Sequence, residues 1–210
     1  MKDKIEQILE YMDELYPLAH CELNYEKDYE LLIATVLSAQ CTDKRVNEVT
    51  KELWRQYDIF SLAKANKKDV EKIIHSVGSY TKKSAYLLEI AKKLVTDYQG
   101  HVPNDREYLE SLPGVGRKTA NVVLSDIYDV PAIAVDTHVE RVSKRLKLAY
   151  QNDSVGKVEE KLMKKFPKDR WSRLHHQFVL FGRYKCKAIH PECNGCKLQA
   201  FCKYYREKQK

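Results

Sequence analysis

Apolar side chains recur every three or four positions along most of this sequence, with charged residues between them. That spacing puts the apolar side chains on one face of a helix, as in an amphipathic helix packed against a core. We therefore expect a mostly helical protein of about ten helices with short connections. The pattern predicts helices in residues 2–16, 46–54, 69–77, 85–95, 120–127, 139–146, 155–162 and 174–181.

Residues 29–39 differ from these segments because they are apolar on nearly all sides. A helix that is apolar all round is usually buried, so this one is predicted at the centre of a lobe. The polar run 38–43 follows it and is expected to form a surface turn. Farther along, Gly78 and residues 79–81 interrupt the apolar period, which predicts a helix, a glycine turn and a second helix.

Residues 130–135 are ambiguous. Their composition suits a short buried strand, and periodicity does not decide between strand and helix. Immediately after them, Thr137 and Glu140 have the Thr-x-x-Glu form of a capping box. A helix is therefore expected to start at this point.

Residues 112–121 join two amphipathic segments through a tight turn that contains Gly114 and Gly116. Glycine allows left-handed backbone angles and lets another group approach the backbone closely. The N–H groups at the start of the second helix have no partners within the helix, so the turn can hold an anion.

Lys118 falls in the first turn of that second helix. A cation there opposes the helix dipole by about 0.3–1 kcal/mol, whereas acidic side chains are favoured at that end. The position therefore calls for a functional reason. The turn alone leaves two interpretations open, a surface lysine near a phosphate and a lysine that takes part in chemistry.

The composition supports a globular protein and suggests an anionic partner. The chain has 210 residues, which suits one large domain or two small lobes, and 43% of them are hydrophobic. Its net charge of +7 favours nucleic acid as the partner, with a membrane surface second. The N-terminus shows no secretory signal, and the most apolar run, 31–39, is too short to span a bilayer. We expect a soluble, cytoplasmic protein.

Six cysteines are present, and two of them, Cys21 and Cys41, stand alone. In a reducing compartment the clustered ones are expected to bind metal rather than to form disulfides. An all-cysteine site suits either tetrahedral zinc or an iron–sulfur cluster. The basic loop that contains Lys187 could dock on phosphates, or it could be an ordinary solvated loop. The clustered cysteines have the spacing C-x6-C-x2-C-x5-C and are Cys186, Cys193, Cys196 and Cys202.

Taken together, these features resemble the endonuclease III family of DNA glycosylases. The resemblance covers nearly the whole chain, in the family's order. It implies an all-α, two-lobed helix–hairpin–helix glycosylase fold, with a [4Fe–4S] cluster in place of zinc. The matching features are LLIA and LSAQ within residues 31–40, LPGVGRKTANVV in residues 112–123, IAVDTHV in residues 133–139 and the four-cysteine spacing.

The resemblance also implies the domain boundaries and the partner. One lobe is a helical barrel over residues 22–132, with the helix–hairpin–helix at about 106–127. The other joins residues 1–21 to residues 133–210 and holds the cluster. The implied partner is double-stranded DNA that contains damaged bases or abasic sites. No membrane partner is expected. The protein is expected to act as a monomer, associated with the nucleoid if it is bacterial.

The implied activity is base excision repair. The enzyme removes oxidised pyrimidines from duplex DNA and then cleaves the strand as an AP lyase. The damaged base is flipped out of the stack, and the neutral amine of Lys118 attacks the sugar carbon that carries it, giving a Schiff base. Partial burial and the positive helix end both favour a neutral amine. β-Elimination then breaks the strand.

Asp136 has two compatible interpretations. From the residues alone it is a helix cap, and by resemblance it is the carboxylate that acts with Lys118 and stabilises positive charge on the sugar. A negative charge is favourable at a helix N-terminus, so one side chain can do both.

Other positions take roles from the resemblance. Gln40 matches the residue that fills the gap left by the flipped nucleotide. The second hairpin carries Ser79 and Tyr80, and the family commonly has a bulky apolar wedge where Ser79 stands. Glu110, Ser38 and His138 match positions near the pocket. The remaining expected DNA contacts are Gly114, Val115, Gly116, Arg117 and Lys187.

Two rival functions are considered. A mismatch glycosylase of the same superfamily usually lacks the lysine, and its adenine-specific branch has a glutamate where this chain reads Ala34-Thr35-Val36. Lys118 without that glutamate favours the bifunctional enzyme. A protein of another class, a non-catalytic DNA-binding module with a structural zinc, would be colourless and contain zinc.

Overall fold

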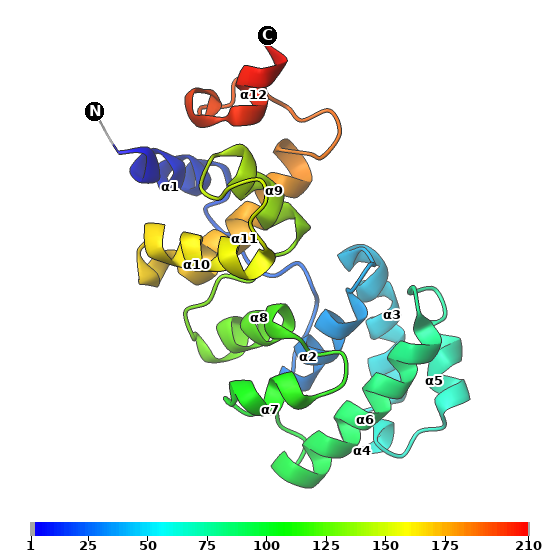
Figure 1. The fold of residues 1–210 in the computed structure, drawn as a ribbon. Coiled ribbons are helices and arrows are strands. Elements are labelled where there is room, and N and C mark those ends of the chain that lie inside the picture. Colours follow the sequence, from blue (N-terminus) through cyan, green and yellow to red (C-terminus); the bar gives the residue numbers. More distant parts are fainter. Residues whose placement is uncertain (1–2, 210) are drawn as a thin grey trace. The chain divides into compact units, whose positions relative to one another are not determined.

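The computed structural model describes residues 3–209, and within them every regular element is a helix (Figure 1). The chain divides into two compact units, residues 21–128 and residues 1–20 together with 129–210. The corresponding expected boundaries were 22–132 and 1–21 with 133–210. Within residues 3–209, no helix is both long and apolar enough to cross a membrane.

The unit of residues 21–128 is built around one buried helix, α2. Every residue of α2 from Tyr29 to Leu37 is buried, as its all-round apolar sequence predicts. It packs against α3, α6 and α8, which present amphipathic faces to it. The helices of this unit are α2 (Asp28–Leu37), α3 (Asp43–Gln56), α4 (Ile59–Leu62), α5 (Lys67–Ile74), α6 (Tyr80–Tyr98), α7 (Arg106–Ser111) and α8 (Arg117–Tyr128).

The other unit joins the N-terminal helix to the C-terminal part of the chain. The Lys4 ammonium donates to the carbonyl of Leu146 at 2.5 Å, and Arg170 donates to both carboxylate oxygens of Asp13 at 2.7 and 2.8 Å. Apolar residues of the N-terminal helix and of the C-terminal part of the chain form one shared core. The helices of this unit are α1 (Lys4–Leu15), α9 (Thr137–Arg145), α10 (Val155–Lys165), α11 (Trp171–Leu180) and α12 (Lys203–Lys208), with short helical turns η1 (Lys168–Arg170), η2 (Phe181–Lys185) and η3 (Gln199–Phe201).

The segment that was ambiguous in sequence, residues 130–135, is an irregular connection that is neither helix nor strand. Strands are stable in pairs, and residues 3–209 provide no partner strand. The apolar side chains from Ala132 to Val135 are nevertheless buried, which accounts for their composition.

The helix after this segment, α9, begins at Thr137, but the expected capping box at Thr137 is wrong. The cap is Asp136, whose Oδ1 accepts from the backbone N–H groups of His138 and Val139, both at 2.8 Å. Aspartate ranks above threonine as a helix cap, and here it precedes the threonine by one residue. Glu140 instead accepts from the Lys144 ammonium at 2.6 Å.

The turn η2 is π-helical and leads from α11 into Cys186. Its Gly182 lies against the start of α9. A Cβ atom on Gly182 would stand 2.7 Å from the Cβ of His138 and 3.2 Å from a guanidinium nitrogen of Arg141. Glycine is therefore required here for close packing.

We predict that Gly182→Ala lowers the free energy of unfolding by about 1–3 kcal/mol, because the added methyl group overpacks this contact. Gly156→Ala is the matched control, since a Cβ on Gly156 of α10 would meet nothing within 4 Å. Alanine in a helix is favoured over glycine by about 0.5–1 kcal/mol, so the control should be neutral or stabilising. Urea unfolding of both variants measures the difference, and equal effects would contradict the packing argument.

Candidate functional site

The turn between α7 and α8 uses its two glycines differently. Gly114 has φ +78°, and a Cβ atom there would stand 2.6 Å from the ring of Tyr86, so both the backbone angle and the packing require glycine. Gly116 has no other atom within 4 Å of where a Cβ would lie. The space over the start of α8 is thus open to a ligand. Val115 is only 5% exposed, which leaves its backbone rather than its side chain for contact with DNA.

Lys118 is the second residue of α8 and is half-buried. Within residues 21–128 its ammonium has no hydrogen-bonding or ionic partner. The N-terminal end of an α-helix carries partial positive charge, so this position is unfavourable for a cation. No contact within residues 21–128 offsets that cost. Its neighbour Arg117 is exposed at the same helix end.

Glu110 lies on the exposed side of α7. Its carboxylate accepts from Arg106 at 3.3 Å, and the same guanidinium nitrogen donates to the side-chain oxygen of Asn121 at 2.8 Å. These contacts join α7 to α8 across the glycine turn. Glu110 therefore has a structural partner in addition to the pocket role implied by the resemblance.

Two exposed turns of the same unit carry the residues expected to enter DNA. Gln40 and Ser79 both have φ +57°, a left-handed conformation that non-glycine residues adopt infrequently. A Cβ on Gly78 would stand 3.9 Å from the carbonyl oxygen of Gln40, so the two turns lie side by side. Tyr80 follows Ser79 as the first residue of α6 and is 40% exposed.

Ser38 ends α2 at the base of the Gln40 turn. Its hydroxyl donates to the carbonyl of Thr35 at 2.8 Å, and its own carbonyl accepts from the N–H of Cys41 at 3.0 Å. Ser38 thus shapes the turn directly.

Asp136 and His138 belong to the other unit, at the start of α9. Both N–H groups that cap the helix donate to Oδ1 of Asp136, and no residue of its unit within 3–20 and 129–209 hydrogen-bonds its Oδ2. Burial lowers the pKa of His138, the Asp136 carboxylate partly opposes this, and the Arg141 guanidinium adds to it. A neutral His138 ring can accept from Arg141, whose guanidinium lies 3.2 Å from Nδ1.

All four C-terminal cysteines line one cavity and are free thiols. The walls of the cavity include Leu146, Phe181 and Leu198. Burial raises the pKa of the Cys186 thiol, and the Arg145 guanidinium, 3.3 Å from its sulfur, opposes that increase. The N–H of Tyr205 donates to the sulfur of Cys202 at 3.4 Å. Hydrogen bonds to sulfur of this kind tune the properties of iron–sulfur centres.

The four thiols make an all-cysteine set, which suits either tetrahedral zinc or an iron–sulfur cluster. Tetrahedral zinc, with Zn–S bonds of about 2.3 Å, would draw the four sulfurs to within about 3.8 Å of one another. Within residues 3–209, no three metal-binding side chains converge closely enough to hold one ion. A four-iron cluster would be held by the same four cysteine thiolates.

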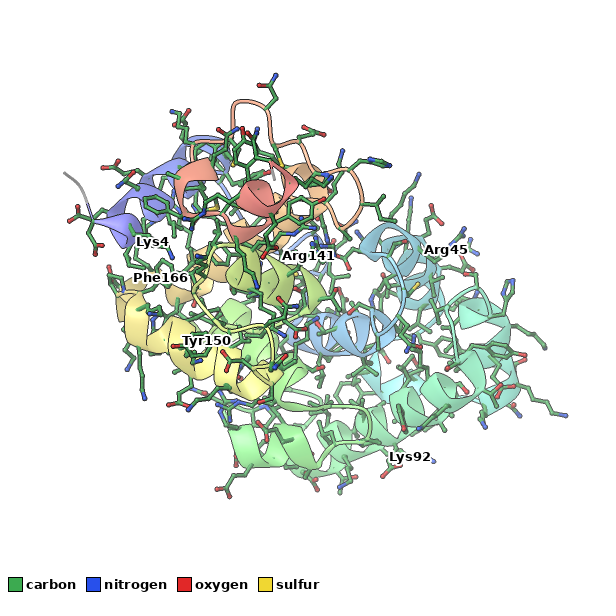
Figure 2. The ribbon with its side chains drawn as sticks, turned by 45° about the horizontal axis from the view of Figure 1, so that its top comes forward. Lys4, Arg45, Lys92, Arg141, Tyr150 and Phe166 are labelled. Atoms are coloured by element: carbon green, nitrogen blue, oxygen red, sulfur yellow. The ribbon has the colours of Figure 1, made fainter. Side chains whose placement is uncertain are left out.

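Two arginines of α9 hold the backbone on both sides of Cys186, and no sequence pattern pointed to them. Arg145 donates to the carbonyls of Lys187 and Ala188 at 2.7 and 3.1 Å. Arg141, labelled in Figure 2, donates to the carbonyls of Cys186 and Gly182 at 3.2 and 2.7 Å. The sequence did not reveal this role, because two arginines four residues apart are ordinary on a helix surface. The carbonyls that they bind lie about forty positions farther along the chain.

Lys187 itself is ion-paired with Glu192 at 2.7 Å in this loop. A phosphate contact would therefore have to share or replace this pair. Exposed pairs of this kind contribute about 0–1 kcal/mol, so replacement would cost little.

The fold and site thus define a helical protein with a helix–glycine turn–helix and a four-cysteine centre. Residues 33–168 match the family described as "HhH-GPD superfamily base excision DNA repair protein". Endonuclease III of Bacillus subtilis is 46% identical, over 99% of this chain and 95% of the relative. Endonuclease III of Escherichia coli K12 is 40% identical, over 97% and 96%.

A solved structure of a trapped endonuclease III–DNA covalent intermediate superposes with a TM-score of 0.93 at 48% identity, covering all of both chains. The chain belongs to the endonuclease III family of HhH-GPD base excision DNA repair proteins. It is a bifunctional DNA glycosylase and AP lyase, as the sequence resemblance predicted.

Proposed function

We propose that this enzyme removes oxidised pyrimidines from duplex DNA and cleaves the resulting abasic site through a Schiff base on Lys118. The observation that carries the proposal is the half-buried amine of Lys118 at the start of α8, which has no hydrogen-bonding or ionic partner within residues 21–128 and lies two residues after the open Gly116. A related endonuclease III of the same fold, trapped as a covalent intermediate with DNA, supports a covalent step of this kind.

DNA binding is assigned to backbone contacts at the glycine turn. A phosphate over Gly116 would meet the N–H groups and positive dipole at the start of α8, with exposed Arg117 beside them. Such contacts position DNA without reading its sequence. They suit an enzyme that must act on lesions in any sequence.

The chemistry follows from one neutral amine and one carboxylate. With the damaged base flipped out, the Lys118 nitrogen bonds to C1′ of the sugar, and the base leaves with the electron pair of its C1′–N bond and takes up a proton. The nitrogen gives up a proton and the C1′–O4′ bond breaks with a proton going to the ring oxygen, which opens the sugar and gives the protonated Schiff base. Removal of a C2′ proton expels the 3′ phosphate and breaks the strand. Water then hydrolyses the Schiff base and frees Lys118.

Asp136 is assigned the role of stabilising positive charge on the sugar and moving protons. Its Oδ1 is occupied by the two capping N–H groups, while its Oδ2 has no hydrogen-bonding partner among the described residues of its own unit. Capping fixes the carboxylate in orientation and leaves the second oxygen for substrate.

The four cysteines of the C-terminal cavity would hold a [4Fe–4S] cluster, which would anchor the loop that carries Lys187. Cleavage of the base needs no step at that centre. The monomeric state, the cytoplasmic location and the effect of Ser79 on lesion preference stay predictions.

The first test concerns Lys118. Borohydride reduces a Schiff base to a stable amine, so the wild-type protein should be trapped on DNA that contains an abasic site or an oxidised thymine. Lys118→Ala should reduce trapping at least about a thousandfold while DNA binding persists, because the nucleophile acts only in the chemical step. Lys92→Ala, which removes an exposed lysine of α6, is the charge-matched control and should trap normally.

If Lys118→Ala is trapped as efficiently as the wild type, Lys118 is not the nucleophile. Absence of trapping by the wild type would contradict the lyase chemistry altogether. A panel of single-lesion duplexes, including mispaired adenine and thymine, then separates this function from that of a mismatch glycosylase.

The second test concerns the cysteine centre. Purified protein should be brown and contain about four irons per chain, with matching sulfide. Cys193→Ser should lose iron, whereas Cys21→Ser, which alters a cysteine of the other unit, should retain it. Colourless protein with one zinc per chain would refute the cluster assignment.

A further inference from the structure

Lys83 is a buried cation that the sequence did not single out as functional. It lies in the first turn of α6 and is 6% exposed. Burial lowers the pKa of its ammonium, and a cation near a helix N-terminus is unfavourable, so the position is costly on both counts. The hydrogen bonds of the Lys83 ammonium compensate for this unfavourable position.

The ammonium of Lys83 binds the end of another helix. Nζ donates to the carbonyls of Leu37 at 2.9 Å and Ala39 at 2.7 Å. Leu37 is the last residue of α2, whose final carbonyls have no partners within the helix. A lysine at this end satisfies such carbonyls and complements the negative end of the dipole.

The same residue is joined to both exposed turns of this unit. Its ammonium holds the carbonyl of Ala39, directly before Gln40, while its backbone N–H donates to the carbonyl of Ser79 at 3.0 Å. Gln40 and Ser79 both have left-handed backbone angles, and such conformations persist only where surrounding contacts fix them. Lys83 supplies a fixed link between the two turns.

We propose that Lys83 is a positioning residue that locks the Gln40 turn to the Ser79 turn, so that the two enter the DNA helix as one rigid unit during base flipping. This inference rests on the proposed function, which places Gln40 in the gap left by the flipped nucleotide. Ser79 is too small to wedge bases apart, which leaves the exposed Tyr80 or Gln40 to take over that role, and the proposal assigns it to Gln40.

A double-mutant cycle tests the link. Lys83→Met removes the donors while keeping an unbranched side chain of similar length. The excision rate under single turnover should fall about tenfold when Gln40 is present, and less than about twofold in a Gln40→Ala background, because interacting residues are not additive. A 2-aminopurine beside the lesion should likewise unstack less in Lys83→Met only when Gln40 is present.

The control is Lys92→Met, in the same helix, which removes the same charge from an exposed side chain (Figure 2). It should leave excision and unstacking unchanged. Amide hydrogen exchange gives a readout that does not depend on activity. The N–H of Cys41, which closes the Gln40 turn onto Ser38, should exchange faster in Lys83→Met and not in Lys92→Met.

An unchanged excision rate in Lys83→Met overturns the proposal, and so does an equal loss in both backgrounds, which indicates general destabilisation. Should Lys83→Met fail to fold, Lys83→Leu, which also removes the donors, is taken through the same cycle and judged the same way. A wild-type enzyme that excises no lesion refutes the proposed function, and the exchange comparison then still decides whether Lys83 holds the turn.

Discussion

An α-helix cannot satisfy its own first N–H groups or its last carbonyls, and the side chains that we propose to be functional all lie at such helix ends. Lys118 stands at the start of α8, Asp136 caps α9, and Lys83 binds the end of α2. Each terminus supplies a fixed partial charge on rigid backbone. Within its own unit, each of these side chains meets a fixed electrostatic environment.

Lys118 and Lys83 show how one unfavourable placement leads to two roles. Both are cations in the first turn of a helix. Lys83 is buried against two carbonyls, so its ammonium is committed to structure. Lys118 is half-buried with no partner among residues 21–128, so its nitrogen remains available for reaction. The difference lies in what the rest of the fold brings to each side chain.

Local patterns predicted much of this molecule from sequence. The buried helix α2, the helices on both sides of Gly114 and the start of α9 follow from spacing over a few residues. The cap at Asp136 is confirmed, whereas the capping box read at Thr137 is wrong, because two adjacent residues both suit that position. The irregular segment at 130–135 resembles a strand in composition, since burial of residues 132–135 selects the same apolar residues.

Long-range contacts could not be predicted in this way. Arg145 reaches carbonyls more than forty residues away, and Lys83 reaches Leu37 at a separation of 46 positions. Nothing in the neighbouring sequence distinguishes these side chains from solvated surface cations.

The measurement that tests the central claim most directly is peptide mapping, by mass spectrometry, of the borohydride-reduced protein–DNA adduct. We predict that the sugar remnant is attached to the side-chain nitrogen of Lys118. Attachment to another lysine or to the N-terminal amine would contradict the assignment of the nucleophile.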